Sequence, residues 1–433
     1  MSEWLGFGAD LPWWAWTLMI VGVIALVSVI GALFFPDWPT EDFTVGLQAE
    51  PGSMEFVAGV ARFLNEPIFQ GGQAELLQNG DAFFPAMLQA IRQARDTVNF
   101  ETYIFEPDEV GQQFMEAFKE RARAGVEVRL LIDGFGGIKL RKKYRDDLQR
   151  AGVRVLRFRP LTLRNLVRIY RRDHRRATII DGKVGFTGGA AVSKKWKGNV
   201  SNKHEWRDSM TRVTGPMVAG IQSAFAEHWV YGTGEVLAGN RFFPSHKQSP
   251  GLCGLSVVSS PSDSEQNIRL LFWLSFTNAR KRLWISNSYF IPDRRLRAAV
   301  IERAIHGVDV RILVPGNQTD AVPVQAAGRS YYQELLEAGV RIFEYAPAMM
   351  HAKTVVIDGI WSIVGSANMD ERSMEINEEN VLGIADAAFA RAVEAGLAID
   401  HAQSREIMLE QWKKRSVLQR GFEVLAKTLI EQY

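Results

Sequence analysis

The feature that most constrains this sequence is an internal repeat, in which two histidine-bearing segments align without a gap. Residues 173–189 read DHRRATIIDGKVGFTGG, and residues 350–366 read MHAKTVVIDGIWSIVGS. A single offset of 177 residues takes His174 to His351 and brings the Ile-Asp-Gly of the two segments into register. Self-similarity of this kind indicates a chain built from duplicated structural units. We therefore expect two homologous halves, each ending in a strand that carries a histidine.

Strand and helix patterns also repeat in the same order, which indicates an α/β fold. Residues 98–105 and 126–133 have the β-branched and apolar composition of buried strands, and residues 110–125 between them carry apolar side chains at helical spacing. The same order of strand, helix and strand returns in residues 282–316, and AGVRVLRFRP at 151–160 matches AGVRIFEYAP. These patterns predict two homologous α/β lobes packed about a pseudo-two-fold axis.

The length of 433 residues suits this arrangement. With 47% hydrophobic and 23% charged residues, the composition excludes a disordered chain. The one cysteine, Cys253, excludes an intrachain disulfide and a cysteine-ligated zinc site. We expect an N-terminal tail and helix over 1–36, a juxtamembrane linker over 37–61, a first lobe over 62–250, and a second lobe with a C-terminal amphipathic tail over 251–433.

Residues 13–35, WWAWTLMIVGVIALVSVIGALFF, contain no charged side chain. At ~1.5 Å per residue, a helix of this length spans about 35 Å and crosses a hydrocarbon core of ~30 Å. Tryptophans lie at both ends, as in aromatic belts, and Pro36 ends the segment. The segment predicts one transmembrane helix. A buried core helix and a cleavable signal peptide are alternatives, although a basic n-region is missing. No lysine or arginine flanks the segment to set its orientation.

Two histidines related by a repeat can meet where the halves join, one as a nucleophile and the other as a general acid. Arg176 and Lys353 lie two residues after the histidines and therefore point to the same face of each strand. Their positive charges would hold a phosphate between the two imidazoles. The pattern predicts a composite site for phosphate chemistry. The alternative is that each histidine is an ordinary strand side chain.

The second histidine segment resembles the HKD motif of the phospholipase D superfamily. The spacing H-x-K-x4-D is followed by GS-x-N, and its residues are His351, Lys353, Asp358, Gly365, Ser366 and Asn368. Other segments similar to the family are YIFEPDEVGQQF, VEVRLLIDGFGG, EWRDSMTRVTGPMV, YFIPD and VDVRILVPG. The resemblance covers residues 62–433 and points most strongly to bacterial cardiolipin synthases and their phospholipase D-like relatives.

The resemblance implies a mechanism. One histidine attacks a phosphodiester and forms a phosphatidyl-histidine, while the other protonates the leaving alcohol and later activates the acceptor hydroxyl. It implies that His174 is the nucleophile and His351 the acid and base, an assignment that the repeat symmetry makes reversible. Asp208 and Glu379 match the family's orienting carboxylates, which fix the imidazole tautomers. Residues expected to support the site are Asp181, Asp358, Ser366 and Asn368.

The first motif departs from the family at two positions. Arg176 stands where the family has lysine, and Ala191 stands at the position equivalent to Asn368. Arginine keeps the positive charge and binds phosphate bidentately, but its planar group is larger and has a fixed geometry. A weak enzyme or one of altered specificity is therefore an alternative. The family's chemistry implies no cofactor and no metal ion.

Residues 139–176 hold fifteen lysines and arginines against three aspartates. Pro160 precedes His174 by 14 residues, whereas Pro347 precedes His351 by 4, so about ten extra residues lie beside the first motif. Leu, Val, Ile and Tyr are mixed with arginine there, a composition suited to anionic headgroups. A solvated charged face and a nucleic-acid groove are the alternatives. The residues expected to contact headgroups or the membrane are Arg164, Arg168, Arg171 and Arg172.

The C-terminal stretch 412–433 is helical in period, with apolar residues on one side and lysine and arginine on the other. Such a helix docks on a membrane or packs on its own domain, and the sequence leaves both open. Gly421 in its middle weakens the case for one continuous helix.

The resemblance implies phosphatidyl transfer of the cardiolipin synthase type, in which phosphatidylglycerol passes its phosphatidyl group to the hydroxyl of a second headgroup. Hydrolysis to phosphatidic acid, an HKD nuclease and a lipid-binding pseudoenzyme are the alternatives. The expected partners are an anionic phospholipid substrate and the membrane, with no nucleic acid. The expected location is the bacterial inner membrane, through a single-pass N-terminal anchor. The side of the membrane and the oligomeric state stay open.

Overall fold

The computed structural model of the chain describes residues 12–19, 22–23, 47–162, 170–246, 250–260 and 266–430. The chain divides into one unit over Met1–Thr44 and a second over Val45–Tyr433. In the first unit, residues 13–19 and 22–23 are helical, and the rest of the expected membrane segment lies outside the described residues. Among the described helices, none combines the length and the apolar character needed to cross a membrane.

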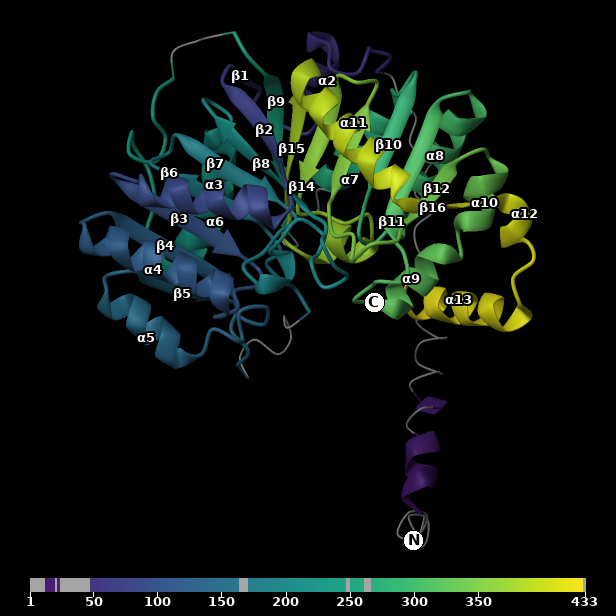
Figure 1. The fold of residues 1–433 in the computed structure, drawn as a ribbon, viewed down its shortest axis with the longest axis horizontal. Coiled ribbons are helices and arrows are strands. Elements are labelled where there is room, and N and C mark those ends of the chain that lie inside the picture. Colours follow the sequence, from purple (N-terminus) through teal and green to yellow (C-terminus); the bar gives the residue numbers. More distant parts are fainter. Residues whose placement is uncertain are drawn as a thin grey trace, which may run out of the picture. The chain divides into compact units, whose positions relative to one another are not determined.

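The second unit is built on two mixed β-sheets with helices packed against them (Figure 1). The first sheet has the order β2-β8-β7-β6-β3-β4-β5, and the second has the order β1-β9-β15-β14-β13-β10-β11-β12-β16. The strands of the first sheet are β2 (Gln73–Gln78), β3 (Thr97–Thr102), β4 (Glu127–Asp133), β5 (Arg154–Phe158), β6 (Ala177–Ile180), β7 (Val184–Gly188) and β8 (Ser209–Thr214). The strands of the second sheet are β1 (Phe69–Gln70), β9 (Cys253–Val258), β10 (Arg282–Ser286), β11 (Asp309–Pro315), β12 (Arg341–Tyr345), β13 (Thr354–Ile357), β14 (Trp361–Gly365), β15 (Asn380–Ala385) and β16 (Ser404–Ile407).

The two sheets repeat one topology. The run β8-β7-β6-β3-β4-β5 of the first sheet corresponds to β15-β14-β13-β10-β11-β12 of the second. In both runs the last three strands are parallel, and the strand that follows the histidine pairs antiparallel with the first of these three. The prediction of two homologous α/β halves is therefore confirmed.

The helices follow the strands in the order expected for crossover connections. Asp108 and Asp293 occupy the same place in the repeat, in the shared Pro-Asp, and each caps the first amides of the next helix with its carboxylate. The helices are α2 (Met54–Phe63), α3 (Gly80–Arg92), α4 (Glu109–Arg123), α5 (Lys142–Arg150), α6 (Val218–Thr233), α7 (Asn267–Thr277), α8 (Arg294–Ile305), α9 (Val322–Arg329), α10 (Tyr332–Glu337), α11 (Ala387–Ala402), α12 (Leu409–Trp412) and α13 (Val417–Ile430).

The end of the segment expected to be a linker, over 37–61, is helical. Residues 54–61, expected to belong to a linker, form most of α2, and its Phe56 ring packs edge-on against Trp361 of the second sheet at 5.3 Å between centroids. Strand β1 then pairs with β9. Helix α2 and strand β1, which precede the first lobe in sequence, therefore belong to the second lobe, because the apolar face of α2 is buried there.

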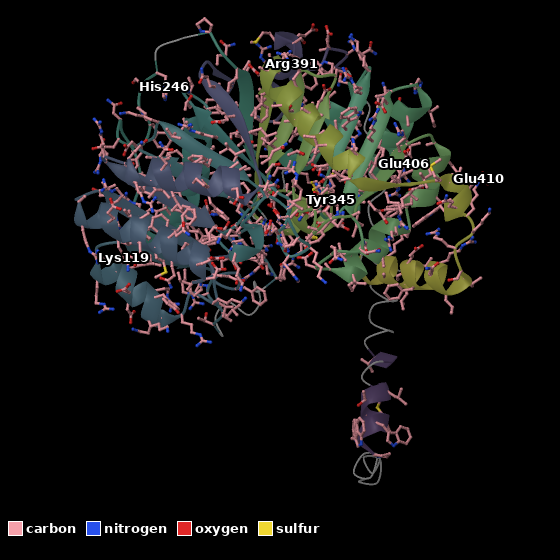
Figure 2. The ribbon with its side chains drawn as sticks, viewed as in Figure 1. Lys119, His246, Tyr345, Arg391, Glu406 and Glu410 are labelled. Carbon is pink, nitrogen blue, oxygen red and sulfur yellow. The ribbon has the colours of Figure 1, made fainter. Side chains whose placement is uncertain are left out.

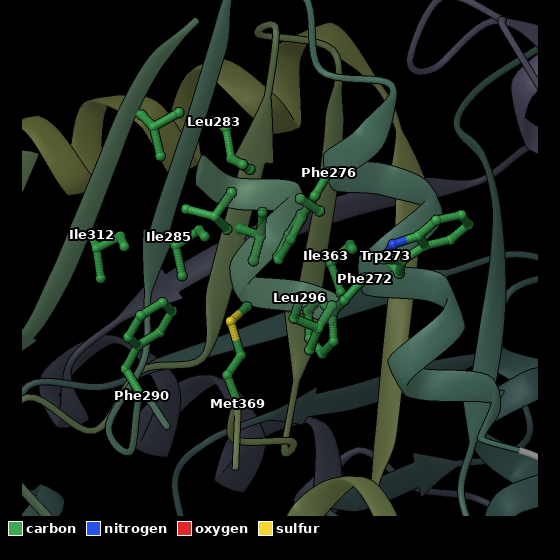
Figure 3. Close-up of a cluster of buried hydrophobic side chains, with 14 of the residues drawn as sticks. Phe272, Trp273, Phe276, Leu283, Ile285, Phe290, Leu296, Ile312, Ile363 and Met369 are labelled. Atoms are coloured by element: carbon green, nitrogen blue, oxygen red, sulfur yellow. The ribbon is translucent and has the colours of Figure 1, made fainter. Parts of the chain in front are cut away.

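Apolar side chains form the core on both sides of each sheet. Within the second half, Phe272, Leu283, Ile285 and Ile363 belong to one buried cluster between the sheet and its helices (Figure 3). A different cluster contains Leu131 and Ile179 of the first sheet together with residues of the second sheet. This shared cluster holds the two halves against each other, while charged residues such as Arg391 and Glu410 lie on the exterior (Figure 2).

Candidate active site

The backbone brings the histidine segments together through two bridges that the repeat relates. Asp173 pairs with Glu378, and Arg207 pairs with Met350. In the first bridge the backbone N–H of His174 donates to the carbonyl of Glu378 at 2.8 Å, and in the second the N–H of the other histidine donates to the carbonyl of Arg207 at 2.7 Å. Each histidine is thus fixed to the other half of the chain.

Each histidine ring is also held by a carboxylate from the other half. His174 Nδ1 lies 3.1 and 3.3 Å from the two oxygens of Glu379, and His351 Nδ1 lies 2.7 Å from Asp208 Oδ2. Both carboxylates are fully buried. A carboxylate that accepts the Nδ1 proton makes Nε2 the reactive nitrogen of the ring. The structure therefore brings these four predicted residues together, with the carboxylates exchanged between the halves.

Burial lowers the pKa of both histidines below the ordinary value for imidazole. The pKa of His351 falls to about 4, because burial disfavours the charged ring and Lys353 repels it. The pKa of His174 is lowered by burial, against the attraction of Glu379. Both rings are therefore neutral at pH 7 without a bound anion. A phosphodiester anion beside them would raise both pKa values.

The two cations have different partners. Lys353 Nζ donates to Ser288 Oγ at 2.8 Å and to the backbone carbonyl of His351 at 2.6 Å. Arg176 donates to the carbonyl of the residue two positions before it, and its guanidinium lies 5.8 Å from the ring centre of Tyr103. Burial lowers the pKa of Lys353 to about 8, and the Arg176 charge adds to this effect. The mutual repulsion of two buried cations favours an anion between them.

The aspartates of the two motifs lie away from the rings and organise backbone. The Asp181 carboxylate accepts hydrogen bonds from the backbone amides of residues 95–97, and the Asp358 carboxylate accepts them from residues 280–282. All six N···O distances are 2.7–2.9 Å. They fix the starts of β3 and β10, the strands next to the histidine strands. Both aspartates have left-handed backbone angles, with φ of 52° and 54°.

Ser366 contacts the site directly, whereas its counterpart is a glycine. Ser366 Oγ donates to Glu379 Oε2 at 2.6 Å. At the equivalent Gly189, a Cβ would lie 2.4 Å from Asp208 Oδ1, so a side chain does not fit there. Asp208 accepts instead from Trp196 Nε1 at 2.8 Å. Asn368 is buried, and its Oδ1 has no hydrogen-bond donor among the described residues.

A buried charged network lies behind His174. His228 Nδ1 is 2.6 Å from Glu101 Oε1, and His228 Nε2 is 2.9 Å from Glu378 Oε2. Burial and the Arg175 guanidinium oppose a charge on His228, but Glu101 and Glu378 outweigh them and raise its pKa to about 10. His228 is therefore an imidazolium that joins the two halves of the chain.

This network also contains the residues that could share a metal ion. Among the described residues, the side chains of Glu101, Asp173 and His228 lie close enough to one another for this. Both nitrogens of His228 already face carboxylate oxygens at hydrogen-bonding distance. The donor set therefore favours a hydrogen-bonded imidazolium over a metal ion.

The arginines expected at a membrane surface do not share one environment. Arg164 and Arg168 lie outside the described residues. Arg171 is half-buried, with its guanidinium 5.6 Å from the ring centre of Tyr170. Arg172 is 4% exposed and lies 3.5 Å from Asp133, so its expected surface position is wrong. A buried arginine beside a buried carboxylate belongs to the structural charge balance.

Two cavities flank α9. One, of about 270 Å³, is lined in part by Tyr289, Val324 and Tyr331, and Tyr289 follows the serine that binds Lys353. The other, of about 420 Å³, is lined by α12, α13 and β16. Charged residues, among them Asp293, Arg297 and Asp370, also line the smaller cavity.

Sequence reasoning missed Tyr103, Ser288 and the His228 network. The first two stand at equivalent places, because β3 aligned with β10 takes Thr97 to Arg282 and therefore Tyr103 to Ser288. A comparison of FETYIFEPD with ISNSYFIPD reveals this difference. The network joins residues 127 positions apart, and no local pattern signals it.

Comparisons with known proteins agree with the geometry. Residues 87–229 and 275–399 match the family described as cardiolipin synthase, PLD-like domain. The chain is 35% identical over 393 residues to cardiolipin synthase A of Pseudomonas fluorescens, covering 90% of this chain and 81% of the relative. It is 32% identical over 380 residues to cardiolipin synthase 1 of Bacillus cereus, covering 86% and 74%.

A solved structure shares the fold. The phosphatidylserine synthase of Haemophilus influenzae Rd KW20 superposes with a TM-score of 0.66 at 15% identity, covering 87% of this chain and 98% of that one. At this identity the similarity establishes the fold alone.

Proposed function

The chain belongs to the family of cardiolipin synthases with phospholipase D-like domains, and from that premise we propose that it is a membrane-anchored phosphatidyltransferase of the cardiolipin synthase type. One observation carries the proposal. Two neutral imidazoles, each held by a buried carboxylate from the opposite half, stand beside two buried cations. This arrangement suits attack on a phosphodiester anion, with one ring as nucleophile and the other as proton donor.

In the first step, His174 Nε2 attacks the phosphorus of phosphatidylglycerol, and the bond from phosphorus to the glycerol oxygen breaks. The Glu379 carboxylate accepts the hydrogen bond from Nδ1–H and stabilises the positive charge that the ring acquires. His351, protonated once the anion is bound, gives its proton to the departing glycerol. Arg176 and Lys353 stabilise the phosphoryl oxygens.

In the second step, the headgroup hydroxyl of another phosphatidylglycerol attacks the phosphatidyl-histidine. His351 takes the hydroxyl proton, the bond from phosphorus to His174 breaks, and cardiolipin leaves. Water in place of the lipid hydroxyl would give phosphatidic acid. The chemistry uses the side chains of both halves and calls for no cofactor.

The membrane anchor in this proposal rests on the uncharged segment 13–35. A single pass through the bacterial inner membrane would keep the site near its lipid substrate. The phospholipid acting as substrate is anionic, which suits the basic surface of the first half.

Purified protein incubated with labelled phosphatidylglycerol tests the proposal, with products separated by mass. We expect cardiolipin and free glycerol in a one-to-one ratio. Phosphatidic acid as the main product would make the chain a hydrolase, and no lipid product would make it a binding protein. Cleavage of single-stranded DNA in a parallel assay would indicate a nuclease. His174→Ala is the matched negative control, and Arg391→Ala, on the exposed side of α11, is the matched active control.

A further inference from the structure

Helix α13 is amphipathic, but it exposes much of its apolar face and buries a charged residue. Its apolar residues Val417, Leu418 and Leu425 are 82%, 86% and 58% exposed. Its buried positions include Glu423, which is 7% exposed and pairs with Arg415 at 2.6 Å. A helix on the surface of a soluble protein normally buries its apolar side. An apolar face that points outward indicates a surface that contacts a membrane or another protein.

The buried side of α13 is anchored on the second lobe. The helix packs against α9, and Lys427 Nζ lies 4.5 Å from the ring centre of Tyr331. Ala426 is 4% exposed in the same contact. The outward direction of the apolar residues is therefore set by polar and ionic contacts on the inner side.

This helix lies at the edge of the second sheet that carries the active site. Lys353 precedes Thr354, which pairs with the last residue of β10. Strand β11 runs parallel to β10, so their carboxyl ends share an edge, and α9 begins soon after β11 ends at Pro315. Figure 1 shows α9 and α13 together at this edge.

The first lobe exposes apolar side chains at the corresponding edge. Phe135 and Ile138, just beyond the carboxyl end of β4, are 52% and 58% exposed. Exposed Lys139 and Arg141 follow them directly. On the second lobe, Lys413, Lys414 and Arg420 are exposed beside the apolar face of α13. Both lobes therefore combine apolar and basic side chains around the strand ends that form the site.

We propose that this edge, defined as Phe135, Ile138, Lys139, Arg141 and α13, docks into the surface of a bilayer that contains anionic phospholipid. The inference rests on the proposed function for the identity of the partner, since a lipid substrate must reach the site from a bilayer. The apolar side chains enter the region below the headgroups, and the basic side chains bind the headgroup phosphates.

The smaller cavity shares Tyr331 with the inner side of α13. Tyr331, which contacts Lys427 of α13, lines the cavity together with Tyr289 and Val324. The Tyr289 hydroxyl donates a hydrogen bond to Asp320 Oδ1 at 2.9 Å, and Tyr289 follows Ser288, which accepts a hydrogen bond from Lys353.

Fluorescence of single-cysteine variants tests the proposal in the full-length chain, reconstituted into vesicles of phosphatidylethanolamine and phosphatidylglycerol. In a Cys253→Ser background, Leu418→Cys and Ile138→Cys carry an environment-sensitive dye. Ile305→Cys is the matched control, because it is 67% exposed and ends α8 at the opposite edge of the sheet. Phosphatidylcholine with a nitroxide near the top of one acyl chain serves as the quencher.

We expect about a two-fold or larger loss of emission at positions 418 and 138 when the nitroxide lipid is present, and none at 305. Red-shifted, unquenched emission at 418 would place α13 in water and overturn the proposal. Blue-shifted, unquenched emission would mean that protein covers the helix, either the N-terminal segment or a second copy, and would also overturn it. The readout needs no turnover, so His174→Ala protein gives the same result, and failure here is separable from failure of the proposed function.

Discussion

A buried network of several charged side chains lies behind His174, whereas behind His351 apolar side chains accompany a buried ion pair between Arg207 and Asp400. The repeat sets Asp173 against Met350 and Arg175 against Ala352. Asp173 and Arg175 belong to the charged network, whereas Met350 and Ala352 lie in an apolar cluster. The duplication thus keeps the two reacting imidazoles and changes what surrounds them. Equivalent histidines can in this way serve different steps of one reaction.

The largest expected effects come from the crossed carboxylates. Glu379→Gln and Asp208→Asn should each lower kcat on the order of 10³-fold, because an amide fixes the wrong imidazole tautomer. If Glu379 serves the nucleophile, its variant slows formation of the phosphatidyl-enzyme in rapid-quench experiments with labelled phosphatidylglycerol. The Asp208 variant should instead affect proton transfer to the leaving group and turnover of the adduct. Slow formation of the adduct that is restricted to the Asp208 variant would reverse the roles of the two halves.

The cations offer the next largest effect. Arg176→Ala removes a preorganised positive charge and should lower kcat about 10²-fold, and Lys353→Ala should cost at least as much. Arg176→Lys should keep most of the activity. Adding Tyr103→Ser then rebuilds in the first half the pair that Lys353 and Ser288 form in the second, and should not lower activity further.

Arg391→Ala controls for unspecific loss of charge in these assays. An Arg176→Ala protein as active as the wild type would show that the first motif does not hold the phosphate, and the two-motif mechanism would then have to be abandoned.

The network behind His174 should appear in the pH dependence of stability. The pKa of His228 is about 10 in the fold against 6.5 for the ordinary group, so its contribution is complete below pH 6.5 and is lost as the pH rises through 10. The slope is at most about 1.4 kcal/mol per pH unit. Thermal unfolding midpoints between pH 6.5 and 9.5 should fall more steeply for the wild type than for His228→Gln.

His401 is the matched control in the second half. Burial lowers its pKa to about 4, so it stays neutral over the whole range. His401→Gln should leave the slope unchanged. Equal slopes for the wild type and His228→Gln would mean that His228 is not charged in the fold.

The smallest effect concerns Ser366. The hydrogen bond from Ser366 to Glu379 has no counterpart at Gly189. Ser366→Ala removes this bond and should cost about 1 kcal/mol, or roughly a five-fold drop in kcat. Ser362→Ala, within strand β14, which ends one residue before Ser366, is the control, because Ser362 Oγ is buried without a hydrogen-bond partner among the described residues. Equal effects of the two substitutions would remove the proposed role of Ser366.

The sequence was sufficient to predict the features that local pattern and repetition encode. The offset between His174 and His351 predicted two α/β halves, and the positions of Arg176 and Lys353 predicted cations on the faces of the histidines. It could not show that Glu379 serves His174, since 205 residues separate them and either histidine was within reach of either carboxylate. The position of α2 on the second lobe likewise depends on long-range packing, which periodicity does not report.

The central claim is that the two histidines have different roles, and trapping the covalent intermediate tests it most directly. His351→Ala protein is mixed with labelled phosphatidylglycerol, quenched and digested, and the modified residue is located by mass spectrometry. The account predicts slow accumulation of a phosphatidyl group on His174 and no adduct in His174→Ala protein. An adduct on His351 in the wild type, or one in His174→Ala protein, would contradict it.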